Sequence, residues 1–80
     1  MDAITARLTN CFQTVFPDLA PADIPHAAQG SLAAWDSTAA IILVNVIEDE
    51  FAVQIDFDRL AELDSFPKIH EYLRQAMAAS

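Results

Sequence analysis

Residues 35–51 read Trp-Asp-Ser-Thr-Ala-Ala-Ile-Ile-Leu-Val-Asn-Val-Ile-Glu-Asp-Glu-Phe and contain the longest apolar segment of the chain. This stretch predicts an α-helix, because apolar residues recur at the i, i+3, i+4, i+7 spacing of a buried face: Ala40, Leu43, Val44, Ile47 and Phe51. The opposite side, which is charged in most surface helices, carries Thr38, Ile42, Asn45 and Val46, with Ile41 at the border. A chain of 80 residues cannot enclose such a helix completely, so we expect its exposed side to meet a partner.

Asp36 and Ser37 stand where this helix must begin. Both residue types favour the N-cap, because a short side-chain oxygen can accept a hydrogen bond from the first free backbone N–H groups. The same position suits anions, since those N–H groups and the helix dipole converge there. Ser37 is therefore well placed to carry a phosphate ester, although capping is the commoner use of a serine at this position.

The residues from Asp36 onward resemble the acyl carrier protein family. The family pattern is an Asp-Ser pair, a hydrophobic helix, a short acidic run and a phenylalanine, and it is matched here by Asp36-Ser37, Leu43-Val44, Ile47-Glu48-Asp49-Glu50-Phe51 and Ile55. The likeness continues without a gap through Leu63, Phe66, Ile69, Tyr72 and Leu73. It covers residues 35–73 closely, which is about half of the chain, and the rest by its layout.

This resemblance implies an all-α fold, a small bundle of three main helices plus one short helix with a long first loop. It implies that Ser37 carries a covalent 4′-phosphopantetheine arm, which holds an acyl or aminoacyl group as a thioester, and that Asp36 helps the phosphopantetheinyl transferase to dock. A partner-binding face is implied at Thr38, Ile41, Ile42, Asn45, Glu48 and Asp49. The partners would be an acyl-loading ligase or synthase and downstream acyl-transfer enzymes with basic docking patches. The chain itself would not be an enzyme.

Three positions depart from the family pattern. Thr38 follows the serine where leucine is usual, and Ile42 and Asn45 stand where acidic residues and methionine are common. The carrier resemblance as a whole implies a fatty-acid, polyketide or other specialised biosynthetic pathway. Together with Trp35, the three departures argue against ordinary fatty acid synthesis and resemble a specialised stand-alone carrier of a secondary or accessory pathway. The cargo remains open between acyl and aminoacyl groups, although the Gly-Gly pair common before the serine of peptidyl carriers is missing.

Two other classes of function are compatible with parts of this sequence. The first is an unmodified acidic interaction module that binds a partner through Ile41, Ile42 and Val46 on the second helix. The second is a small hydrolase, for which Ser37, a histidine and an aspartate would form a triad. The hydrolase is disfavoured, because the glycines of a nucleophile elbow are absent and a small bundle offers little room for a substrate pocket.

The charge and the cysteine count of the sequence exclude further classes of function. With 12 acidic against 4 basic residues the net charge is −8, which disfavours nucleic acid and suits basic partner surfaces. Cys11 is the only cysteine, so no internal disulfide or cysteine-built metal site is expected, and its helical position predicts a buried side chain. No metal site is expected at the acidic residues either. We expect one domain over residues 1–80, a cytoplasmic monomer with no membrane insertion.

Elsewhere the pattern predicts a first helix over residues 3–16, with Ile4, Leu8, Cys11, Phe12 and Val15 inward. Residues 17–34, with three prolines and the only glycine, predict a long connection that Leu19, Ile24 and Leu32 pack down. Residues 52–57 predict an extended loop held by Val53, Ile55 and Phe57, and residues 58–63 a short helix. Asp64-Ser65 then caps a last helix with Phe66, Ile69, Leu73 and Met77 inward.

Overall fold

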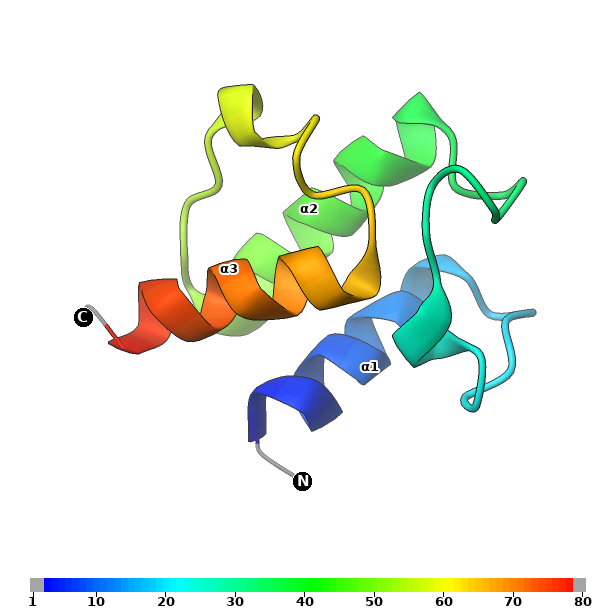
Figure 1. Ribbon diagram of the computed structural model, residues 1–80. Coiled ribbons are helices and arrows are strands. Elements are labelled where there is room, and N and C mark those ends of the chain that lie inside the picture. The colour runs from blue at the N-terminus through cyan, green and yellow to red at the C-terminus, as the bar shows by residue number, and fades with distance from the viewer. Residues whose placement is uncertain (1–2, 79–80) are drawn as a thin grey trace.

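Three α-helices build the protein: α1 (Ala3–Val15), α2 (Ser37–Phe51) and α3 (Phe66–Ala78) (Figure 1). The computed structural model describes residues 3–78, apart from the side chain of Phe57. Two 3₁₀ helices, η1 (Ile24–His26) and η2 (Phe57–Arg59), lie in the connections, and no strand is present in this part of the chain. The predicted all-α bundle of three main helices, one short helix and a long first loop is therefore confirmed, and η1 is an addition to it.

The core is assembled around α1, which packs against both α2 and α3. The predicted inward stripes are confirmed: the buried residues are Leu8, Cys11 and Phe12 on α1, Leu43, Ile47 and Phe51 on α2, and Phe66, Ile69 and Leu73 on α3. Met77, at the end of the α3 stripe, is half-buried against this core.

Phe12 lies at the centre of this core. Its ring centroid is 5.4 Å from that of Trp35, which precedes α2, and 5.2 Å from that of Phe66, which begins α3. Trp35 is 2% exposed, so burial of a large aromatic side chain fixes the entry to α2. The starts of α2 and α3 are thereby held against the last turn of α1.

The long connection between α1 and α2 is packed and hydrogen-bonded. Ile24 of η1 is fully buried, while Leu19 and Leu32 are half-buried, which confirms the three residues expected to hold this segment. The connection also meets the start of α3: the Gln29 N–H donates to the Asp64 carbonyl at 2.7 Å, and the Phe66 N–H donates to the Ala27 carbonyl at 2.9 Å. An isolated antiparallel bridge, Ala28 with Ser65, lies between these two bonds.

The segment between α2 and α3 is extended and then turned. Ile55 is buried and Val53 half-buried, as expected, whereas the side chain of Phe57 lies outside the described residues. The short helix is η2, which begins at Phe57 and continues through residues 60–62 as turns, because the Glu62 N–H donates to the Arg59 carbonyl only three residues back. At the start of α3, Ser65 Oγ accepts a hydrogen bond from the Lys68 N–H at 3.4 Å.

Within residues 3–78, no helix combines the length and apolar character that a membrane crossing requires.

Candidate functional site

The first turn of α2 separates the roles of Asp36 and Ser37. The Asp36 backbone is extended (φ −96°, ψ −173°), and its carboxylate accepts a hydrogen bond from the Ala39 N–H at 2.8 Å, so Asp36 is the N-cap. Ser37 is the first residue of α2 and is exposed. Within the described residues its hydroxyl makes no hydrogen bond. The fold uses Asp36 to begin the helix and leaves the Ser37 hydroxyl available for chemistry.

A surface trough begins at Ser37 and follows α2. A first cleft of about 230 Å³ is lined by Ser37, Ala40 and Ile41 on one side and by Leu60 and Ala61 on the other. A second cleft of about 360 Å³ shares Ile41 and Leu60 with the first and extends to Glu48 of α2 and to residues 54–56. We call these two neighbouring clefts, which share the lining residues Ile41 and Leu60, the Ser37 trough. It lies between α2 and the segment around η2.

A separate apolar groove of about 460 Å³ borders α2 at Ala39 and Ile42. Its other walls come from the end of α1 and the first loop, including Phe16, Leu19 and Leu32. At 3.6 residues per turn, Ile42 lies about 140° around the helix from Ser37, whereas Ile41 and Glu48 lie only about 40° and 20° away. The apolar groove and the Ser37 trough therefore flank different sides of α2.

The predicted partner face is exposed at most of its positions. Thr38, Ile41, Ile42, Asn45 and Asp49 are exposed on α2, while Glu48 is half-buried. Ile41 and Ile42 are 44% and 49% exposed, and they are the exposed large hydrophobic residues of the described chain. Val46, expected beside them, is half-buried against the core. The apolar part of this face is therefore centred on Ile41 and Ile42.

The acidic end of α2 has contacts that the sequence pattern did not reveal. The Glu48 carboxylate accepts a hydrogen bond from the Ile55 N–H at 2.8 Å, which fixes the chain after the helix. Glu50 pairs with Arg7 of α1 at 2.9 Å, and the Arg7 guanidinium also donates to the Glu50 carbonyl and lies 4.5 Å from the Phe51 ring centroid. Two of the three carboxylates thus make contacts within the protein, and docking of a partner at Glu48 and Asp49 remains a prediction.

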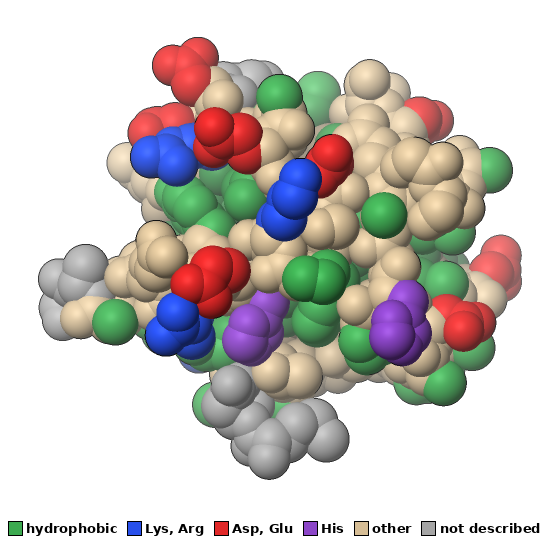
Figure 2. All heavy atoms as spheres, in the orientation of Figure 1, with side chains coloured by type: hydrophobic (Ala, Val, Ile, Leu, Met, Phe, Trp, Pro, Cys, Tyr) green, Lys and Arg blue, Asp and Glu red, His purple; other side chains and the backbone are tan. Residues whose placement is uncertain are grey.

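Every Lys and Arg side chain of the described residues pairs with a carboxylate. The pairs are Arg7–Glu50, Arg59–Glu62, Lys68–Asp64 and Arg74–Glu71. On the face shown in Figure 2, the basic side chains accordingly lie beside acidic ones. The cations are neutralised locally, so the excess negative charge comes from other carboxylates, including Asp49, Asp56 and Asp58, which are exposed. The exposed carboxylates therefore give the surface a net negative potential.

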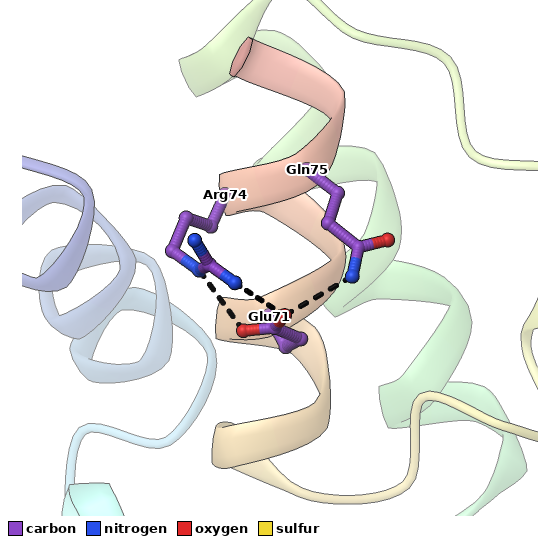
Figure 3. A network of polar contacts seen from close by, with 3 residues as sticks. All are labelled: Glu71, Arg74 and Gln75. Atoms are coloured by element: carbon purple, nitrogen blue, oxygen red, sulfur yellow. Dashed lines mark hydrogen bonds and ion pairs between the residues drawn. The ribbon is translucent and has the colours of Figure 1, made fainter. Parts of the chain in front are cut away.

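The network of Glu71, Arg74 and Gln75 on α3 carries no site chemistry (Figure 3). Hydrogen bonds from Arg74 and Gln75 lower the pKa of Glu71, and the same pairing raises the pKa of Arg74. Both residues are exposed and lie one helical turn apart, which is the ordinary geometry of a surface ion pair. These shifts describe charge pairing along a helix.

The histidines lie on other elements than Ser37. His70 of α3 shares a hydrogen bond with Thr5 of α1, 2.9 Å between Oγ1 and Nε2, and its ring stacks on Phe66. His26 is exposed in η1. Among residues 3–78, no three His, Cys, Asp or Glu side chains converge in a way that would hold a metal ion.

Comparisons with models of protein families, with curated proteins and with solved structures found no match to this chain.

Proposed function

We propose that this chain is a carrier protein whose Ser37 bears a 4′-phosphopantetheine arm. The observation that carries the proposal is the division of labour at the start of α2, where Asp36 caps the helix and the exposed Ser37 hydroxyl has no hydrogen-bond partner among the described residues. A serine that serves the fold would be expected to cap the helix itself. The Asp-Ser pair, the apolar helix and the acidic run of the carrier pattern add independent support.

The residues at this position suit a phosphodiester. The backbone N–H groups at the start of α2 and the positive end of its dipole favour a negative group on the Ser37 oxygen. The hydroxyl is exposed, so a modifying enzyme can reach it without unfolding the helix. The Ser37 trough then offers the attached arm a path along α2, because its first cleft is lined by Ser37 itself.

The chain would act by presentation. When bound, the arm supplies a terminal thiol that holds an acyl or aminoacyl cargo as a thioester. The residues of the chain hold the attachment point rigidly, through the Asp36 cap and the buried Trp35 before it. Thr38, Ile41, Ile42 and Asn45 surround the arm with an exposed face, and unpaired carboxylates such as Asp49 attract basic surfaces of a phosphopantetheinyl transferase and of loading and acyl-transfer enzymes.

The test is the mass of the intact protein after incubation with coenzyme A, Mg²⁺ and a broad-specificity phosphopantetheinyl transferase. The wild type is expected to gain one phosphopantetheine, and Ser37→Ala none. The matched control is Ser31→Ala, which removes another exposed serine hydroxyl outside the proposed partner face. This variant is expected to be modified like the wild type. Modification of Ser37→Ala, or of no protein with several transferases, would contradict the proposal.

A second candidate is favoured by the exposure of Ile41 and Ile42. An unmodified acidic module could bind a partner through these two side chains, since adjacent exposed isoleucines form an apolar contact point on a charged surface. Binding by such a module would survive Ser37→Ala and would be lost in Ile42→Asp. A carrier requires the Ser37 hydroxyl, so the two variants separate the candidates.

A further inference from the structure

We propose that the apolar groove between the end of α1, the first loop and α2 docks a basic amphipathic segment of a partner protein, which inserts an apolar side chain beside Ile42. The inference goes beyond the proposed arm on Ser37, because the groove lies on another side of α2 and is present in the unmodified chain. It applies to a carrier and to an unmodified module alike.

The groove is an open apolar surface built from three parts of the chain. The end of α1 contributes Val15, the first loop contributes Leu19 and Leu32, and α2 contributes Ile42. Leu19 and Leu32 are half-buried and Ile42 is 49% exposed, so these side chains remain partly in contact with water. Covering such a surface with an apolar side chain is favourable in proportion to the apolar area removed from water. The groove therefore suits an apolar group of a partner.

Hydrogen bonds and a ring contact hold the walls of the groove in place. The Phe16 N–H donates to the Phe12 carbonyl at 2.7 Å, and the Leu19 N–H donates to the Phe16 carbonyl at 3.0 Å. Further along the first loop, the Trp35 N–H donates to the Leu32 carbonyl at 3.0 Å, and the Trp35 ring centroid lies 5.8 Å from that of Phe16. A partner therefore meets a preformed surface, so little binding free energy is lost in ordering the groove.

The charges around the groove select a basic partner. Residues 8–58 contain no Lys or Arg, and every residue that lines the groove falls within this range. Asp18 lines the groove and is exposed. Asp49, also exposed, lies about 20° around α2 from Ile42 and roughly 10 Å further along the helix axis. Neither carboxylate forms an ion pair with a Lys or Arg of residues 3–78, so both attract cations that flank the apolar side chain of the partner.

The same charges disfavour two other occupants of the groove. The chain has a net charge of −8, so a second copy is repelled. Its four Lys and Arg side chains all pair with carboxylates of their own chain, which leaves none for Asp18 and Asp49 of another copy. A membrane surface that contains anionic lipids is repelled in the same way. A basic segment gains from both the apolar surface and the charge.

The test titrates the unmodified protein with three synthetic helical peptides that contain no tryptophan. The first has leucines on one face and lysines on the other, the second has glutamates in place of the lysines, and the third has serines in place of the leucines. Backbone amide shifts are followed by NMR, and the fluorescence of Trp35, the only tryptophan, reports on the wall at Phe16. The lysine–leucine peptide is expected to shift Leu19, Leu32 and Ile42 and to bind at least about tenfold more tightly than either of the others.

Variants locate the binding site. Ile42→Ser should weaken binding of the lysine–leucine peptide about tenfold. Ile41→Ser should weaken it much less, because Ile41 is 44% exposed but lines the Ser37 trough and not the groove. Asp18→Lys should weaken binding about three- to tenfold, and its matched control is Asp58→Lys, which makes the same change at an exposed position of η2 outside the groove. Circular dichroism checks that each variant is folded, and the Asp18 pair of variants decides the matter if Ile42→Ser is not.

Four results would overturn the inference. They are equal binding of the glutamate–leucine peptide, equal binding of the lysine–serine peptide, equal losses in Ile41→Ser and Ile42→Ser, and equal losses in Asp18→Lys and Asp58→Lys. Amide shifts at Leu19 and Leu32 that change when the protein alone is diluted would show that a second copy occupies the groove, which also overturns it.

The outcome is separable from that of the proposed function. Ser37→Ala is expected to bind the lysine–leucine peptide like the wild type, because Ser37 does not line the groove. If no transferase attaches an arm but the peptide binds at the groove, the carrier function falls and this inference stands. If the arm attaches and the groove ignores the peptide, only this inference falls.

Discussion

Replacing Asp36 and Ser37 one at a time separates the residue that begins α2 from the residue proposed to carry the arm. Asp36→Ala removes the hydrogen bond to the Ala39 N–H, 2.8 Å long, and a carboxylate at the positive end of the helix. Loss of an N-cap costs about 1 kcal/mol, and loss of the favourable interaction with the dipole about 0.3–1 kcal/mol more. We therefore expect Asp36→Ala to lower the free energy of unfolding by roughly 1–2 kcal/mol.

The expected change is large enough to measure. In a domain of this size, each kcal/mol shifts the melting temperature by roughly 4–8 °C, so Asp36→Ala should melt well below the wild type in a circular dichroism experiment. Asp36→Asn keeps an accepting oxygen and should recover most of the loss. Ser37→Ala should stay within about 0.5 kcal/mol of the wild type, because the hydroxyl makes no bond within the described residues and alanine favours the helix.

The stability of Ser37→Ala relative to Asp36→Ala decides which side chain caps α2. If Ser37→Ala destabilises the protein as much as Asp36→Ala does, the Ser37 hydroxyl caps the helix and is not free for esterification. The mass of the intact protein after incubation with coenzyme A and a transferase measures the other role, since Ser37→Ala is expected to abolish modification while leaving the fold intact. Asp36→Ala is expected to weaken the fold while its Ser37 hydroxyl remains present.

Three further predictions concern the frame around the site. Arg7→Gln should lower the free energy of unfolding in urea by about 1–2 kcal/mol, because it removes the ion pair with Glu50 and the contact with the Phe51 ring. The control Arg74→Gln removes the same charge from an exposed ion pair and should leave the urea midpoint nearly unchanged. Equal losses of stability in the two variants would contradict this prediction. Ala52, the C-cap of α2, has a left-handed backbone (φ 54°) that glycine adopts more easily than alanine, so Ala52→Gly should raise the free energy of unfolding by roughly 0.5–1 kcal/mol. A lower melting temperature for Ala52→Gly would contradict this expectation. Burial raises the pKa of Cys11 from 9.0 to about 11, so the folded state keeps a proton that the unfolded chain releases; stability should fall as pH rises from 9 towards 11, and this loss should be smaller in Cys11→Ala.

The helices could be predicted from the sequence because their evidence is local. Leu8, Cys11 and Phe12, and likewise Leu43 and Ile47, repeat at a spacing that only a helix brings to one face, and all five are buried. The structure adds Trp35 to this core, because a large apolar side chain beside a helix start favours burial. The position of Ser37 followed from the capping pattern of Asp36 and Ser37, although that pattern did not decide which of the two is the cap.

The contacts missed from the sequence are those without a local pattern. The hydrogen bonds from Gln29 to Asp64 and from Phe66 to Ala27 join backbone groups, which nearly every residue carries, so no side-chain pattern predicts them. Glu50 finds Arg7 across 43 residues, a partner that only the packing of α1 on α2 supplies. The acidic run of residues 48–50 predicts docking of a partner, and its contacts show in addition that Glu48 binds the Ile55 N–H and Glu50 pairs with Arg7.

The contact between the long connection and the start of α3 also determines where the chain accepts change in length. Residues 17–23 are exposed apart from the half-buried Leu19, so an added residue there displaces little. Residues 27–29 are different, because one inserted residue would shift Ala27, Ala28 and Gln29 out of register with Asp64, Ser65 and Phe66. Tags, labels and circularly permuted ends therefore belong before η1, and a protease should cut the connection there first.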